Sequence, residues 1–267
     1  MRLKSFLLVA LVGLPLTGAA PRAQPPAGAS DMPAAEFQFA RLLYNGVPGC
    51  AGGGGWGRGW GGTACTDWPD AEYHFMRGVT RLTRIDGAVV EPGGYGGRQL
   101  SLADESIFDY PWLYAAEVGN WVLDNYETEQ LREYLLRGGF LMVDDFHGDY
   151  QWQGFLESML RVFPDRPILD IPETDEVLHV LYDLNQRIQI PGLAALSWGQ
   201  TWEGGEDGKP PHWRGVYDDD GRLIVAINHN MDLGDAWEHA DDPRYPEPMT
   251  GLAYRFAVNY VIYAITH

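Results

Sequence analysis

Two carboxylates and an imidazole follow a short apolar run in the middle of the chain, between Gly138 and Gly148. Two glycines and then four apolar residues predict a buried strand over 140–143, and Asp144, Asp145 and His147 come where that strand ends. In an open α/β sheet, ligands bind outside the carboxyl ends of the strands, because side chains there leave the packed core. These three residues are therefore the first candidates for a functional site.

The types of these residues allow two kinds of chemistry. Carboxylate oxygens and imidazole nitrogens suit Mn, Zn or Fe, so Asp144, Asp145 and His147 are candidate ligands of a divalent metal ion, the candidate cofactor. A carboxylate pair could also share a proton for acid–base catalysis, because each charge raises the pKa of the other group. The structural alternative is that one Asp caps the next helix while the other accepts hydrogen bonds from backbone amides of the turn.

Two further strand ends carry polar groups. His229, Asn230 and Asp232 follow the apolar run 222–228, and Glu117 follows the apolar run 111–116. If the sheet is parallel, these ends lie at the same edge as Asp144, and such convergence of ionisable groups is typical of functional sites. His229 therefore joins the catalytic candidates, and Glu117, Asn230 and Asp232 are binding candidates.

Arg255 is the remaining candidate. It lies one helical turn before Asn259 in the segment 251–265, which is apolar nearly all round and should pack in the interior. A buried Arg needs a carboxylate partner, and Asp144, Asp145 or Asp232 would serve. Arg255 would then either bind a ligand or tie the last helix to the sheet.

The elements that must position these residues alternate along the chain. Apolar runs and turn signals predict strands at 36–43, 88–91, 111–116, 140–143, 168–170 and 222–228. Capping residues and amphipathic spacing predict helices at 70–82, from the N-cap Thr128 to Gly138, at 151–162 and at 251–265. Strands alternating with helices indicate a mostly parallel sheet that is covered on both faces, a three-layer α/β sandwich.

The first residues resemble an export signal. Arg2 and Lys4 precede an apolar segment at 6–16, and small residues suited to cleavage follow. We expect a signal peptide at 1–23, a flexible segment at 24–35 and a single α/β domain at 36–267, in the periplasm or secreted. No later segment has 18 apolar residues without a charge, so the mature chain has no expected transmembrane segment.

The charge and the cysteine content limit which classes of partner, and which cellular compartment, are expected. The formal net charge of −18 argues against nucleic acid, whose binding depends on Lys and Arg at the phosphates. Cys50 and Cys65 flank a glycine-rich loop, and an oxidising compartment favours a disulfide between them over a two-cysteine metal site. The chain has 10 Trp and 14 Tyr, several of them in expected loops, so a saccharide, a peptide or another cell-envelope protein is the candidate partner.

Several segments together resemble a bacterial family known as domain of unknown function 4159. They are Phe37-x-Phe39-Ala40-Arg41-Leu42-x-Tyr44, Thr66-Asp67-Trp68-Pro69-Asp70-Ala71-x-Tyr73-x-Phe75, Tyr110-Pro111-x-Leu113-Tyr114, Leu131-Arg132-x-Tyr134-Leu135-x-x-Gly138-Gly139-Phe140-Leu141, Asp144-Asp145, Asn230-x-Asp232-Leu233-Gly234-x-Ala236-Trp237-Glu238 and Arg255-x-x-x-Asn259. The resemblance covers nearly the whole mature chain. It implies a flavodoxin-like fold similar to the class I glutamine amidotransferases.

In the enzymes of that group, a Cys lies on a tight turn after a central strand. The corresponding turn here, from Asp144 to His147, has no Cys, so the resemblance carries over no amidotransferase chemistry. Two hypotheses follow. The absent nucleophile favours a non-catalytic ligand- or protein-binding module of the cell envelope, and the alternative is a metal-dependent hydrolase that uses the Asp and His residues at the strand ends.

Overall fold

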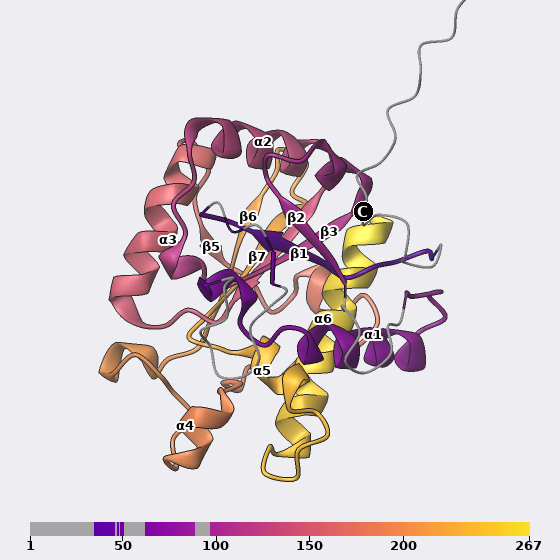
Figure 1. The fold of residues 1–267 in the computed structure, drawn as a ribbon, viewed down its shortest axis with the longest axis vertical. Coiled ribbons are helices and arrows are strands. Elements are labelled where there is room, and N and C mark those ends of the chain that lie inside the picture. The colour runs from indigo at the N-terminus through magenta and orange to yellow at the C-terminus, as the bar shows by residue number, and fades with distance from the viewer. Residues whose placement is uncertain (1–34, 46, 48, 51–61, 89–96) are drawn as a thin grey trace, which may run out of the picture. The chain divides into compact units, whose positions relative to one another are not determined.

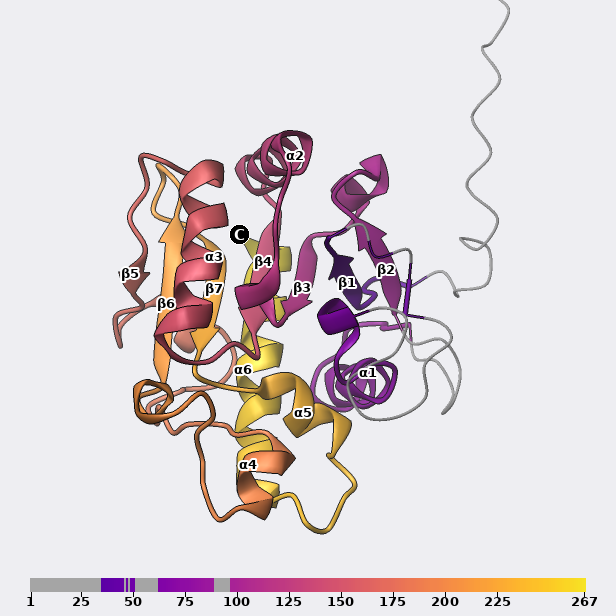
Figure 2. The same cartoon turned by 60° about the vertical axis from the view of Figure 1, so that its left-hand side comes forward.

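One mixed sheet organises the part of the chain that the computed structural model describes, residues 35–45, 47, 49–50, 62–88 and 97–267. Its strands are β1 (Ala40–Leu43), β2 (Arg98–Ser101), β3 (Trp112–Ala116), β4 (Phe140–Asp144), β5 (Leu169–Asp170), β6 (His212–Tyr217) and β7 (Leu223–His229). Their order is β2-β1-β3-β4-β7-β6-β5 (Figure 2). The pairs from β2 to β7 are parallel, and β6 and β5 continue the sheet antiparallel. The expected mostly parallel sheet is confirmed.

Helices accompany the strands in the alternating order that the sequence predicted (Figure 1). The α-helices of the described residues are α1 (Asp70–Leu82), α2 (Asn125–Leu136), α3 (Gly148–Val162), α4 (Leu193–Ser197), α5 (Leu233–Glu238) and α6 (Glu247–Thr266). Short 3-10 turns lie at Gly62–Cys65, Glu105–Asp109, Val118–Asn120, Glu176–Leu178 and Glu206–Gly208. None of the helices in these ranges is long and apolar enough to cross a bilayer.

Alternation along the strands separates two cores. In β3, Trp112 and Tyr114 face a core that includes Phe75 of α1, Trp237 of α5 and residues of α6. Leu113 of the same strand faces the other core, which includes residues of α2 and α3. Successive strand residues point to opposite faces, so a strand buried on both sides is apolar throughout.

The two crossovers beside β3 run over opposite faces of the sheet. The connection from β1 to β2 contains α1, whereas that from β3 to β4 contains α2, and these helices pack in different cores. The loops that follow β1 and β3 therefore diverge. Such a point, at the carboxyl ends of the strands, is where open α/β sheets form a ligand crevice.

Several expected boundaries need correction. The cap of α2 is Asp124, not Thr128: its side chain accepts the Glu127 N–H at 2.8 Å, and the Glu127 carboxylate accepts the Asp124 N–H in return. This reciprocal arrangement satisfies two backbone donors at once, which a cap at Thr128 could not do. β1 begins at Ala40, and Phe37, before it, forms an isolated bridge with Gly87. β2, β6 and α5 were not expected from the sequence.

The expected pairing of Cys50 with Cys65 is confirmed: the two cysteines form a disulfide, and the described residues contain no free cysteine. Most of the glycine-rich loop that it closes, 51–61, lies outside the described residues, as do residues 89–91 of an expected strand. The expected signal peptide and nearly all of the flexible segment also lie outside them.

Candidate metal centre

Three carboxylates from distant parts of the chain meet at the carboxyl edge of the sheet. Oxygen atoms of Asp67, Asp145 and Asp232 all lie within 4.8 Å of one another. Asp67 lies between β1 and α1, Asp145 directly follows β4, and Asp232 lies between β7 and α5. The site therefore forms beside the diverging loops, at the sheet edge where open α/β proteins commonly bind ligands.

The backbone at the strand ends aims these side chains. Glu117, Asp145 and Asn230 each follow the last residue of a neighbouring strand, and all three have a positive φ, of 48°, 53° and 64°. Asp67 has a φ of 61°. Left-handed backbone is costly for residues other than glycine and concentrates at functional sites, with Asn and Asp tolerating it best. The unfavourable left-handed backbone therefore occurs at four positions around this edge of the sheet.

Electrostatic repulsion within this trio is strong. Burial and the charges of neighbouring carboxylates raise the pKa of Asp67, of Asp145 and of Asp232 well above the usual range. Two negative charges about 4.8 Å apart repel by roughly 3 kcal/mol at an effective dielectric constant of about 20. The trio therefore gains from taking up a cation or protons.

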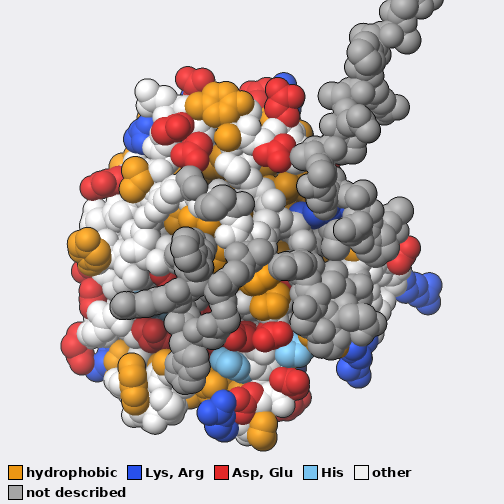
Figure 3. Space-filling model, viewed as in Figure 1, with side chains coloured by type: hydrophobic (Ala, Val, Ile, Leu, Met, Phe, Trp, Pro, Cys, Tyr) orange, Lys and Arg blue, Asp and Glu red, His pale blue; other side chains and the backbone are white. Residues whose placement is uncertain are grey.

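Further acidic groups surround the three. Burial raises the pKa of Glu117 to about 7, with an added contribution from Glu203, and burial raises the pKa of Glu238 also to about 7. Figure 3 shows acidic side chains gathered beside histidine side chains in the lower part of the view. Arg41 acts on Asp67 in the opposite direction, but its guanidinium is already held by Glu72 at 2.5 Å, and both side chains are fully buried.

Asp144 is held by backbone and not by the trio. Its side chain is fully buried, and Oδ2 accepts the N–H groups of Leu233 and Gly234 at 2.7 and 3.2 Å, in the first turn of α5. Burial raises the pKa of Asp144 to about 6. Asp144 thus serves as an anchor for α5, close to the structural alternative considered from the sequence but on a later helix than expected.

His147 lies next to Asp145. Its Nε2 is 3.3 Å from Asp145 Oδ1, and burial lowers its pKa to about 4, so the ring is neutral at pH 7. The Nδ1 atom is buried without a hydrogen-bond partner among the described residues. The predicted proximity of the two residues is observed, and His147 offers a nitrogen that can accept a proton.

His229 does not join the carboxylates. Its ring packs against Phe146 and Trp152, with ring centroids 4.9 Å away in each case, and Nε2 contacts the Gly148 carbonyl at 3.3 Å. Both aromatic residues belong to the core beneath α3, whereas Asp144 contacts α5 on the other face. The two strand ends share one edge of the parallel sheet, as expected, but alternation along the strands directs the side chains of His229 and Asp144 to opposite faces, so the two groups do not meet.

The binding candidates divide into two groups. Asp232 belongs to the trio and also caps α5, accepting the Asp235 N–H at 2.8 Å, and Glu117 lies close enough for its charge to act on Asp145. Asn230 braces loops instead: its side chain accepts from Gly148 N at 2.8 Å and donates to two carbonyls of the 207–210 segment.

Arg255 requires a correction. Its side chain is exposed on α6 and does not pair with Asp144, Asp145 or Asp232. The helix has a solvent-facing stripe in spite of its apolar composition, and Arg255 lies on it. Asn259, one turn later, is fully buried and binds the backbone at Val177 and Tyr182.

The sequence reasoning missed Asp67, Glu203 and the acidic residues of α5 as site residues. Asp67 has no local signature of a ligand, because its partners in the trio follow other strands. The signal that could have indicated it was its place between a predicted strand and helix, at the same sheet edge as Asp145.

Comparison with known protein families identifies the family of the chain. A family model described as Domain of unknown function (DUF4159) matches residues 38–265. No curated protein matches the chain.

Proposed function

The chain belongs to the DUF4159 family of domains of unknown function, and on this premise we propose that it is a binding module of the cell envelope whose site holds a divalent cation. The ligands of that cation are Asp67, Asp145 and Asp232. The single observation that supports this function is the convergence of three carboxylates within 4.8 Å, two of them from strand ends and one from the loop before α1.

The chemistry of the donors selects the class of cation. An all-oxygen set of carboxylates suits the hard cations Ca²⁺, Mg²⁺ and Mn²⁺, whereas Zn²⁺ and Cu²⁺ favour imidazole or thiolate. A cation in this position would offset the repulsion among the three charges. It would also present open coordination positions to an anionic group of a peptide, a saccharide or a partner protein.

The scaffold is proposed to be similar to the class I glutamine amidotransferases. The parallel strands, the helices on both faces and the left-handed turn at Asp145 after a central strand support this assignment. On this assignment, the turn from Asp144 to His147 corresponds to the one that carries the cysteine nucleophile in those enzymes, and both cysteines of the described chain are in the disulfide. A binding function is consistent with that exchange.

The proposed location is the periplasm or the exterior of the cell. The basic and then apolar sequence of the first residues supports export, and the Cys50–Cys65 disulfide is compatible with an oxidising compartment.

Calorimetric titration of the purified protein with Ca²⁺, Mg²⁺ and Mn²⁺ tests the cation site. Asp145→Asn is the informative variant, because Asn tolerates the left-handed backbone at this position and only the charge changes. We expect at least a tenfold loss of affinity, whereas the control Glu157→Gln, at an exposed position of α3, retains it. Equal affinity of the wild type and Asp145→Asn, or no cation binding by the wild type, would refute the proposal.

A metal-dependent hydrolase is the second candidate, and His147 is the observation that favours it. A neutral imidazole beside a cation ligand can accept a proton from an attacking water, provided that the ring is deprotonated at the working pH. We expect His147→Gln to retain cation affinity and to lose turnover of ester substrates. A metal-loaded wild type without turnover on such a panel would exclude this candidate and leave the binding module.

A further inference from the structure

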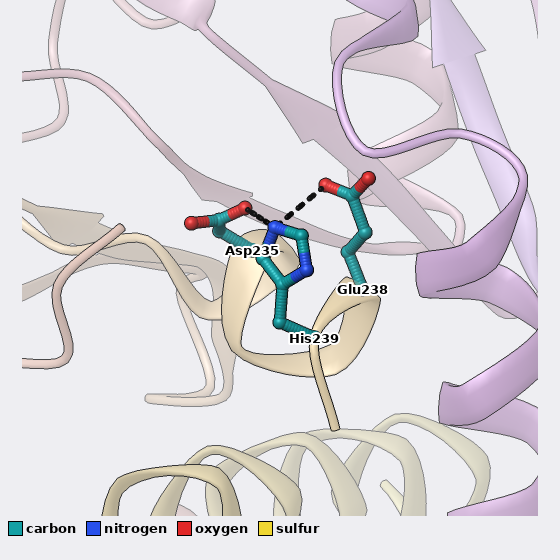
Figure 4. Close-up of side chains that lie close together, drawn as sticks. All are labelled: Asp235, Glu238 and His239. Atoms are coloured by element: carbon teal, nitrogen blue, oxygen red, sulfur yellow. Dashed lines mark ion pairs between the residues drawn. The ribbon is translucent and has the colours of Figure 1, made fainter. Parts of the chain in front are cut away.

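A second group of ligands lies on α5, next to the trio. Asp235, Glu238 and His239 are spaced i, i+3 and i+4, so their side chains share one face. One ligand atom of each lies within 4.8 Å of the others. His239 Nε2 is 3.1 Å from Asp235 Oδ1 and 3.6 Å from Glu238 Oε2, and Figure 4 shows the ring between the two carboxylates.

The rest of the fold holds this helix in place. Trp237 is fully buried, with its ring 4.8 Å from that of Phe75 and 5.6 Å from that of Tyr114. Asp144, the last residue of β4, accepts the N–H groups of Leu233 and Gly234 in the first turn of this helix. The polar face of α5 is therefore fixed while its ligand atoms remain accessible, with His239 25 % exposed.

The two groups of ligands share a border. A methyl group on Gly192 would lie 2.8 Å from Asp232 Oδ2 and 3.2 Å from Asp235 Oδ2, so oxygens of both groups line the same small space. On the other side, Asp67 reaches α5: a methyl group on Gly234, in the first turn of that helix, would collide with Asp67 Oδ2. The Oδ2 atom of Asp67 is buried and receives no hydrogen bond from the described residues. Carboxylates of the two groups thus face one another with a buried oxygen left without a donor.

We infer that Asp235, Glu238 and His239 form a second cation site beside the first, so that this edge of the sheet holds a two-cation centre. This inference rests on the proposed cation site at Asp67, Asp145 and Asp232. Imidazole with two carboxylates favours Mn²⁺, Fe²⁺ or Zn²⁺ over Ca²⁺, so the two sites differ in preference. Two divalent cations held close together can bind the same anionic oxygen group from two sides.

Titration with Mn²⁺, followed by calorimetry and by electron paramagnetic resonance, tests the inference. The wild type is expected to bind two Mn²⁺ per chain and to show spin coupling between them at saturation. His239→Ala is expected to bind one Mn²⁺ and to lose the coupling. The control is His179→Ala, which removes an exposed imidazole that pairs with Asp183 in the same i, i+4 spacing, and it is expected to bind two.

The outcomes separate this inference from the proposed function. Binding of one Mn²⁺ by the wild type, weakened by Asp145→Asn and unaffected by His239→Ala, would overturn the second site and leave the first. His239 would then be only an ion-pair partner of Asp235. Absence of Mn²⁺ binding in the wild type would overturn both. Glu238→Gln, which keeps the size of the side chain, replaces His239→Ala if that variant does not fold, and it too is expected to remove one Mn²⁺.

Discussion

Replacement of Asp144 by Asn tests the electrostatics of the strand end independently of any metal. The carboxylate is fully buried and accepts two N–H groups of α5. Asn keeps an oxygen that can accept the same two bonds. The Tyr114 hydroxyl lies beside Asp144 and can accept a hydrogen bond from the new amide group. The substitution therefore removes the charge and retains the anchor.

The pH dependence of the effect follows from the pKa of Asp144, which burial raises from 3.8 to about 6. The folded state then holds this proton more tightly than the unfolded state, so the stability of the wild type falls as the pH rises from about 4 through 6. The buried charge lowers the free energy of unfolding of the wild type by about 1.5 kcal/mol at pH 5 and by about 3 kcal/mol at pH 8. The variant has no charge at this position, so its free energy of unfolding is not lowered in this way.

Urea unfolding at both pH values, in the presence of a chelator, measures the difference. We expect Asp144→Asn to be more stable than the wild type at pH 8, and we expect this advantage to shrink by roughly half at pH 5. The control Glu157→Gln should stay within about 0.5 kcal/mol of the wild type at both. An advantage that does not change with pH, or a variant less stable than the wild type at pH 8, would refute the reasoning.

Three further substitutions probe the scaffold, each measured by chemical unfolding. Cys50→Ser removes the cross-link between residues 15 apart and should cost about 3 kcal/mol, a loss that should vanish when both proteins are compared under reducing conditions. Glu72→Ala leaves the buried Arg41 without its carboxylate partner, with one bond to the Ala64 carbonyl remaining, and should cost about 3–5 kcal/mol. Glu133→Ala, in an exposed Arg–Glu pair, should cost under about 1 kcal/mol, and equal losses would contradict the burial argument. Asn230→Ala removes three hydrogen bonds from a left-handed position and should cost about 2–4 kcal/mol, so a neutral result would show that the loop does not need this brace.

Local signals in the sequence were enough to place the elements that carry strong patterns. The helix expected at 70–82 has the same bounds in the structure, because Phe75 and Val79 face the core at helical spacing and Asp70 lies at its first turn. The strand after Gly139 is one residue longer than expected, and Asp144 is its last residue.

Elements defined by their partners could not be predicted in this way. β6 contains Gly215, and Gly215 is paired with Ala226 of β7 and with Leu169 of β5. Without the neighbouring strands, the region before Arg214 has the composition of a loop. Glycine there leaves room for the Leu223 side chain, a contact that only the folded sheet creates.

The candidate site shows the same limit. Asp145 and Asp232 could be named because each follows a strand with a clear apolar pattern, but the sequence could not show that Asp67 meets them. That contact depends on the order β1-β3-β4 and on the divergence of the crossovers. The prediction that Arg255 is buried was wrong for a related reason, since apolar composition does not reveal which stripe of a helix faces the solvent.

The pairing of β4 with β7 has a consequence for how the chain reaches its fold. β4 ends at Asp144, and its neighbour begins at Leu223, so one side of the central strand has no partner until most of the chain has been synthesised. Contacts between such distant segments slow folding, and an apolar strand that waits with an open edge is prone to aggregate. The same delay applies to Asp145 and Asp232. The carboxylate trio therefore forms late, together with the β4–β7 pairing at the middle of the sheet, and a chain that is cut before β7 lacks both the centre of its fold and its site.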